Sequence, residues 1–192
     1  MQQDARASLD QDGYRANVAI VICNNRGKVL WARRSRRDGW QFPQGGVEHN
    51  ETAEEAAFRE LYEEVGLLRE HVRLVGRTQS WLRYDVPKLT ARSRRKRGNF
   101  RGQKQLWFLF HMIGHDSDVR LDRVSRPEFD SWRWVDYWDP VDRIVEFKRN
   151  VYQKALAELE PYISKVLTST AELVNQELRE PGAQRRAGKT RI

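Results

Sequence analysis

The chain has 192 residues, of which 35 are lysine or arginine and 27 are aspartate or glutamate, so its net charge is +8. This length favours one domain with an extension, and seven tryptophans and seven phenylalanines supply bulk for a core. The sequence contains no apolar run that resembles a membrane span or a secretory signal. The single cysteine, Cys23, excludes an internal disulfide and fits a reducing cytoplasm.

The first part of the chain alternates apolar runs with turn residues. Val18–Cys23 and Lys28–Ala32 flank a turn of sequence Asn-Asn-Arg-Gly, which predicts a β-hairpin. Trp40–Gly46 contains one proline and two glycines, so we expect this segment to be a loop.

The clearest predicted helix covers Thr52–Val65. Thr52 and Glu55 have the spacing of a capping box, and Gly66 stands where a left-handed residue ends a helix. An apolar face for packing is formed by Ala53, Ala56, Ala57, Leu61 and Val65.

Four further segments are predicted strands. Val72–Gly76, Ser80–Val86 and Phe129–Val135 are short, whereas Gln105–Ile113 is a continuous apolar run. Such a run is typical of a central strand that is buried on both faces.

A second long helix is predicted after Asp139, a suitable N-cap that precedes Pro140. We expect Pro161 to break or kink it, Tyr162–Arg179 to form another helix, and the segment from Pro181 onward to be disordered. The apolar stripe of the long helix consists of Val141, Ile144, Val145, Tyr152, Ala155, Leu156 and Leu159.

This order of elements predicts an α/β domain with a mixed sheet and helices on both of its faces. We place the domain at residues 13–160 and a helical extension with a basic tail at residues 161–192.

The positive charge is concentrated in the segment from Lys88 to Lys104, which contains no acidic residue. Such a run is either a solvated loop or a surface that attracts phosphate backbones, and the two interpretations are compatible. Its basic residues equal the net charge of the chain: Lys88, Arg92, Arg94, Arg95, Lys96, Arg97, Arg101 and Lys104.

The predicted helix Thr52–Val65 carries glutamates at an unfavourable spacing. Glu60 and Glu64 lie four residues apart, with Glu63 beside them, and like charges so placed on a helix repel one another. Divalent cations would relieve this repulsion, because Mg²⁺ prefers hard oxygen ligands. Arg59 can hold one carboxylate by charge-assisted hydrogen bonds, while the carbonyl group of Gly45 can add a ligand.

The segment Gly45–Leu67 matches the pattern G-x5-E-x7-R-E-U-x-E-E-x-G-U at every fixed position, where U is a bulky aliphatic residue. It therefore resembles the Nudix hydrolases. The resemblance implies an α/β/α sandwich that hydrolyses a diphosphate linked to another group and uses Mg²⁺, with Mn²⁺ or Zn²⁺ as alternatives. It also implies that Glu60, Glu63 and Glu64 are metal ligands.

Other segments between Gly13 and Tyr152 resemble the bacterial RNA pyrophosphohydrolases, among them Trp40–Gly46, Gly102–Gln105 and Val145–Arg149. This resemblance implies a metal-dependent enzyme that converts the 5′-triphosphate end of RNA to a monophosphate and so promotes mRNA decay. Where these relatives have a hydroxyl residue before the tryptophan, this chain has Gly39, so a side-chain contact is lost.

The resemblance also assigns roles outside the acidic helix. Glu128 would reach the metals or the attacking water, and either Glu128 or a helix glutamate such as Glu64 would accept the proton. The resemblance further places Arg34, Val145, Phe147 and Lys148 near the first or second nucleotide. Phe147 is either a platform for a base, which Arg34 could cover from the other side, or an incidental contact with another segment. Separately, Arg15, Tyr84 and Lys148 are candidates for phosphate contact.

Two other functions share these features. The dinucleoside polyphosphate hydrolases, which cleave diadenosine tetraphosphate, carry much of the same pattern. A non-catalytic RNA-binding module is the other alternative, although such a module gains nothing from clustered like charges. The sequence does not identify a protein partner.

Overall fold

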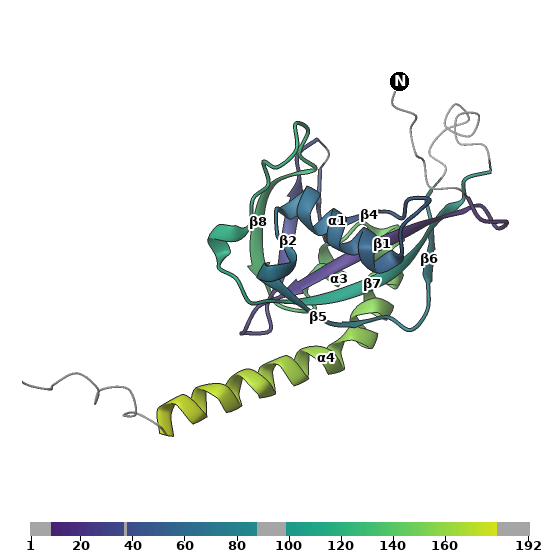
Figure 1. The fold of residues 1–192 in the computed structure, drawn as a ribbon. Coiled ribbons are helices and arrows are strands. Elements are labelled where there is room, and N and C mark those ends of the chain that lie inside the picture. Colours follow the sequence, from purple (N-terminus) through teal and green to yellow (C-terminus); the bar gives the residue numbers. More distant parts are fainter. Residues whose placement is uncertain (1–8, 37, 88–98, 180–192) are drawn as a thin grey trace, which may run out of the picture.

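The computed structural model describes residues 9–36, 38–87 and 99–179, with side chains described as far as Thr168. Eight strands of the described residues form one sheet, in which β1 (Tyr14–Cys23) and β7 (Gly102–Met112) are central neighbours (Figure 1). The other strands are β2 (Val29–Arg34), β3 (Trp40–Gln41), β4 (Gln44–Gly46), β5 (Val72–Arg77), β6 (Leu82–Asp85) and β8 (Phe129–Val135). The helices are α1 (Ala53–Val65), α3 (Asp139–Arg143) and α4 (Glu146–Arg179), with short 3₁₀ turns at Arg69–His71 and Asp116–Asp118.

The sheet is mixed, as the sequence predicts. The main path of strands is β3-β2-β1-β7-β5, while β4, β6 and β8 pair with β1, β7 and β2. β1 and β7 run parallel from the Tyr14–Gly102 pair to the Cys23–His111 pair, and the other pairings are antiparallel. The predicted central position of the Gln105–Ile113 run is confirmed, because β7 has neighbours on both sides.

Two apolar layers cover the two faces of the sheet. Side chains alternate along a strand, so Val18 and Ile20 of β1 face α1, whereas Ala19 and Val21 face α4. An α/β/α sandwich results (Figure 1).

The predicted helix start and end of α1 are confirmed. The Thr52 hydroxyl accepts a hydrogen bond from the Glu55 backbone N–H, and the Glu55 carboxylate accepts one from the Thr52 N–H. Gly66 adopts φ of +73°, the left-handed conformation that glycine reaches without strain.

The prediction of a loop over Trp40–Gly46 was wrong, because this segment forms β3 and β4. A proline at position 43 permits both strands, since it lies between them and its carbonyl accepts from the Ile20 N–H at 2.9 Å. The aromatic and polar residues on either side can therefore pair with β2 and β1.

The prediction of one helix from Asp139 to Pro161 was also wrong. α3 ends at Arg143, and the extended Ile144 turns its side chain into the core while Val145 is 46% exposed. Pro161 does not end α4. It is exposed, so water can solvate the carbonyl group left without a helical partner, while Ile163 and Val166 beyond it are buried.

An aromatic cluster anchors the first turns of α4 to the sheet. The Tyr152 ring lies 5.4 Å from the ring of Phe42, 4.8 Å from that of Trp107 and 6.0 Å from that of Trp31. Such ring pairs add to the apolar area that these side chains bury. The cluster therefore fixes the helix turn that carries Phe147 and Lys148.

Some predictions concern residues that the structure does not describe. The greater part of the basic run, residues 88–98, and the basic tail from Gln184 to Arg191 lie outside the described ranges. Among the helices that are described, none has the length and apolar character needed to cross a membrane.

We predict that the folded domain needs α4 beyond Pro161. Truncation after Glu160 removes the buried Ile163 and Val166, so the free energy of unfolding should fall by about 3 kcal/mol. Truncation after Thr168 keeps both side chains and should leave the stability unchanged. Urea denaturation of both proteins checks this, and equal midpoints would show that the C-terminal part of α4 contributes nothing.

Candidate active site

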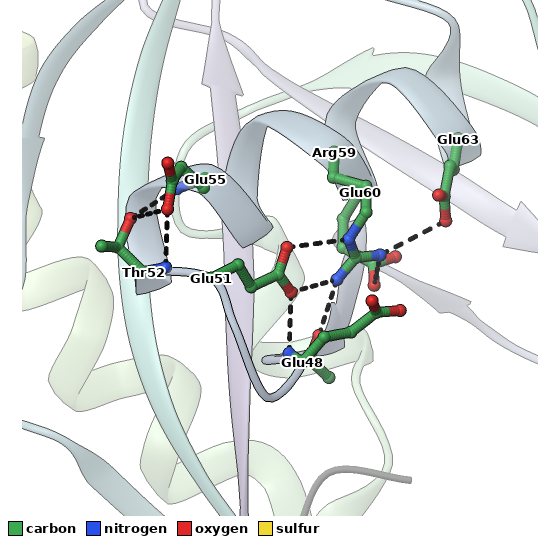
Figure 2. Close-up of polar contacts among 8 residues, drawn as sticks. Glu48, Glu51, Thr52, Glu55, Arg59, Glu60 and Glu63 are labelled. Atoms are coloured by element: carbon green, nitrogen blue, oxygen red, sulfur yellow. Dashed lines mark hydrogen bonds and ion pairs between the residues drawn. The ribbon is translucent and has the colours of Figure 1, made fainter. Parts of the chain in front are cut away.

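Arg59 organises the start of the acidic site by binding Glu51, which lies before α1 (Figure 2). Its Nε and Nη2 donate to the two carboxylate oxygens of Glu51 at 3.0 and 2.7 Å. Its Nη2 also donates to the carbonyl oxygen of Gly46 at 2.8 Å. The hydrogen bond from Arg59 lowers the pKa of Glu51. This bidentate contact joins α1 to β4 and to the loop between them.

Arg59 also binds two of the predicted metal ligands (Figure 2). Its Nη1 donates to Glu60 at 2.7 Å and to Glu63 at 3.4 Å. Within the described ranges, no three acidic, histidine or cysteine side chains are arranged to hold a metal ion. Glu60 and Glu63 are drawn toward Arg59, so both would have to turn from it to share a cation.

Glu60 lies directly against the backbone of Gly45. Glu60 is only 9% exposed, and burial raises the pKa of its carboxyl group despite the hydrogen bond from Arg59. A Cβ atom at position 45 would stand 1.8 Å from the Glu60 carboxyl carbon. Only glycine lets the chain pass this close, and its carbonyl group is thereby brought beside the glutamates.

Glu64 is held by the strand next to Gly45. Its Oε2 accepts the Gln44 backbone N–H at 2.8 Å. Burial, followed by the charge of Glu60, raises the pKa of Glu64 well above its usual value. A divalent cation would relieve the repulsion between these carboxylates. The oxygen atoms of Glu60, Glu63, Glu64 and the Gly45 carbonyl are of the kind that Mg²⁺ prefers, so their chemistry suits such an ion once Glu60 and Glu63 turn from Arg59.

A cavity of about 640 Å³, here called the main pocket, opens beside Glu64. It brings together most of the predicted functional residues, from β2, β4, α1, β6, the loop before β8 and the start of α4. Those that line it are Arg34, Gly45, Glu64, Tyr84, Glu128, Val145, Phe147 and Lys148. Arg15, Arg59, Glu60 and Glu63 do not line it.

Lys148 and Phe147 give the main pocket a cation and an aromatic surface. The Lys148 ammonium donates to the Gln44 side-chain oxygen at 2.9 Å, and burial lowers its pKa to about 8. The Phe147 side chain is 39% exposed, with its ring 6.0 Å from the Tyr84 ring. Tyr84 itself is buried, and its hydroxyl donates to Gln103. An exposed ring beside a buried ammonium suits a base followed by phosphates.

Arg34, which is predicted to bind a base, forms an ion pair with Glu128, the predicted catalytic residue of the loop. Arg34 Nε lies 3.2 Å from Glu128 Oε1, and both side chains are partly exposed. The Ser35 backbone N–H donates to the Glu128 carbonyl at 2.8 Å, so β2 fixes the loop that carries Glu128. Glu128 thus faces the main pocket together with Glu64.

Three basic residues of the described chain are less free to bind phosphate than the sequence suggests. The Arg15 guanidinium lies 5.3 Å from the Phe100 ring, and its Nε is buried without a hydrogen-bond partner among the described residues. At the end of the basic run, Arg101 pairs with Asp85 at 3.0 Å and Lys104 with Asp10 at 2.9 Å. These two cations are therefore neutralised by aspartates.

Sequence reasoning missed a buried polar network beneath the main pocket. Gln105 is fully buried and donates to Asn17 at 2.7 Å and to the Gln44 side chain at 3.4 Å. The sequence does contain a sign of this network, because Gln105 is a polar residue at the start of an apolar central strand. Buried amides need partners, so such a residue indicates a nearby polar site. Gln44 joins this network to both Glu64 and Lys148.

We predict that Gly45→Ala destabilises the protein and abolishes hydrolysis, because the new methyl group displaces the Glu60 carboxylate. Thermal unfolding and turnover with Mg²⁺ are the measurements. The double change Gly45→Ala with Glu60→Ala removes the clash and should regain stability without regaining activity. A fully active, stable Gly45→Ala protein would contradict the packing argument.

Comparison with known proteins identifies the family. The family model for the NUDIX domain matches residues 13–155. The dihydroneopterin triphosphate pyrophosphohydrolase of E. coli has 22% identity and a TM-score of 0.56, with 73% of this chain and 95% of that chain covered. The C. elegans Ap4A hydrolase in a binary complex has 19% identity and a TM-score of 0.54, with 73% and 93% covered. These two structures share the fold, and the match to the family model over most of the chain shows that this protein belongs to the Nudix hydrolases, which act on phosphoanhydride bonds.

Proposed function

We propose that this Nudix hydrolase is an RNA 5′-pyrophosphohydrolase that converts the 5′-triphosphate end of RNA to a monophosphate, and that it promotes mRNA decay in the cytoplasm. The observation that carries the proposal is the half-exposed ring of Phe147 in the same pocket as Lys148 and Glu64. An unpaired base can stack on this ring while its 5′ phosphates extend toward the lysine and the glutamates.

The residues of the main pocket have different proposed roles in binding and hydrolysis. Lys148 binds a phosphate oxygen, and the Arg34 guanidinium lies against the base held by Phe147. Glu60, Glu63, Glu64 and the Gly45 carbonyl would hold the divalent ions that Nudix hydrolases generally use, typically Mg²⁺. Such ions, when bound, neutralise phosphate charge and make water a nucleophile. Glu128 or Glu64 accepts the proton as water attacks phosphorus and the phosphoanhydride bond breaks.

A dinucleoside polyphosphate hydrolase is the second candidate, because it needs the same phosphate and base contacts. The paired state of Arg101 and Lys104 favours it, since these residues offer no unpaired charge to an RNA backbone. The C. elegans Ap4A hydrolase shares the fold, which by itself does not choose between the substrates.

A competition assay tests the proposal. Triphosphorylated RNA and diadenosine tetraphosphate are mixed with the protein and Mg²⁺, and kcat/KM is measured for each. We expect RNA to be preferred by a wide margin. Glu64→Gln is the control, and it should abolish both reactions because it removes a ligand charge at constant shape. A large preference for the dinucleotide would assign the second function instead.

We predict an alkaline limb in the pH profile of kcat/KM. Lys148 is positive below its pKa of about 8, so its attraction for phosphate is lost as the pH rises past that value. Lys148→Arg retains its charge to much higher pH, and its profile should lack this limb whatever its absolute rate. Identical limbs in both proteins would show that Lys148 does not set the alkaline decline.

A further inference from the structure

A second hollow adjoins the main pocket across a narrow ridge of backbone. Arg34 and Glu128 line the main pocket, whereas the next residues, Ser35 and Pro127, line a hollow of about 540 Å³. The Ser35 hydroxyl donates to the Pro127 carbonyl at 2.6 Å, so the two sides of the ridge are joined. We call this cavity the arginine hollow, lined in part by Ser35, Arg36, Val119, Arg120, Leu121 and Pro127.

The arginine hollow is lined by two arginines, Arg36 and Arg120, and by two aspartates, Asp122 and Asp130. Asp122 pairs with Arg120 and Asp130 with Arg33, so the unneutralised charge comes from Arg36 and from two arginines beside the hollow. These two, Arg123 and Arg126, lie on the exposed segment that leads to Pro127. None of these three arginines has an ion-pair partner among the described residues. Arg120 pairs with Asp122 at 3.0 Å, but both side chains are more than half exposed, and such a pair contributes little stability. A phosphate can therefore compete for Arg120.

The opposite candidate surface, at β6 and the start of β7, differs in this respect. There Arg83 pairs with Asp12 at 3.0 Å, and Arg101 and Lys104 each pair with an aspartate. The Arg83–Asp12 and Arg101–Asp85 pairs are about as exposed as the Arg120–Asp122 pair, so pairing alone does not exclude RNA there. The difference is that each of these three cations has a carboxylate partner, whereas Arg36, Arg123 and Arg126 have none among the described residues. The described charges thus favour the arginine hollow.

The lining of the arginine hollow also suits single-stranded nucleic acid. Val119, Leu121 and Pro127 supply apolar surface for bases, while guanidinium groups at the rim can bind phosphates with two hydrogen bonds. β2 and β8 run side by side (Figure 1), with Arg34 opposite Phe129. Arg34 lines the main pocket and Phe129 lines the arginine hollow, so this strand pair carries residues of both cavities.

We propose that the arginine hollow binds the RNA chain that follows the reacting 5′ end. This inference rests on the proposed function. The triphosphate lies at Lys148 and Glu64, the first bases lie near Phe147 and Arg34, and the chain then crosses the Ser35–Pro127 ridge. The arginine hollow thereby favours long RNA over small nucleotides with the same reacting group.

The test compares two proteins that have lost the same charge. Arg36→Gln with Arg126→Gln changes the arginine hollow, whereas Arg73→Gln with Arg77→Gln changes two exposed arginines on β5, at the other edge of the sheet. KM for a triphosphorylated RNA of twelve nucleotides is measured over a range of NaCl concentrations. We expect the first variant to raise KM about tenfold and to flatten its salt dependence by about one unit of slope, and the second to resemble the wild type.

A second measurement uses the wild-type protein, so it does not depend on how a variant folds. The same RNA, with methylene groups in place of the anhydride oxygens and 4-thiouridine at its fifth position, is crosslinked by light. We expect crosslinked peptides from residues 33–36 or 119–130.

Equal losses in both double variants, or crosslinks confined to residues 81–87 and 99–104, would overturn the assignment of the arginine hollow while leaving the proposed function intact. A wild-type protein that does not hydrolyse triphosphorylated RNA at all would overturn the proposed function and this inference with it.

Discussion

The short strand β4 is the constraint on which the geometry of the site depends. It pairs with β1 from the Asn17–Gly46 to the Ala19–Gln44 position, so the sheet fixes its place. From there the Gly45 backbone contacts Glu60, and the Gln44 N–H binds Glu64. The Gln44 side chain extends to Lys148 on α4. One strand therefore sets the position of the acidic helix relative to the phosphate-binding lysine, although the two helices lie on different faces of the sheet.

This arrangement places charges where they are costly until a ligand arrives. Burial raises the pKa of Glu64 and lowers that of Lys148, so each group is less readily charged than it would be in water. Both shifts reverse when a cation lies beside the glutamates and a phosphate beside the lysine. The site gives up some stability of the free protein and gains affinity for a polyphosphate held with divalent ions.

The sequence predicted the elements whose signals are local. The capping box and terminal glycine of α1 involve residues only a few positions apart. The continuous apolar run of β7 by itself predicts a buried strand. The errors arose where tertiary contacts decided the outcome. α3 ends because Ile144 enters the core. α4 continues past Pro161, where Ile163 packs in the core layer on its face of the sheet and Val166 is buried. The place of Val145 in the main pocket followed only from the family resemblance.

By itself, the sequence determined the chemistry of the acidic helix, because the spacing of Glu60, Glu63 and Glu64 within one helix already makes them neighbours. Only the tertiary structure decided which basic residues are free to bind a substrate. Arg34 pairs with Glu128, which lies 94 positions away in the sequence, and Arg101 pairs with Asp85 of the neighbouring strand. Charge pairing depends on distance in space, and a run of lysines and arginines does not reveal which of them the fold has neutralised.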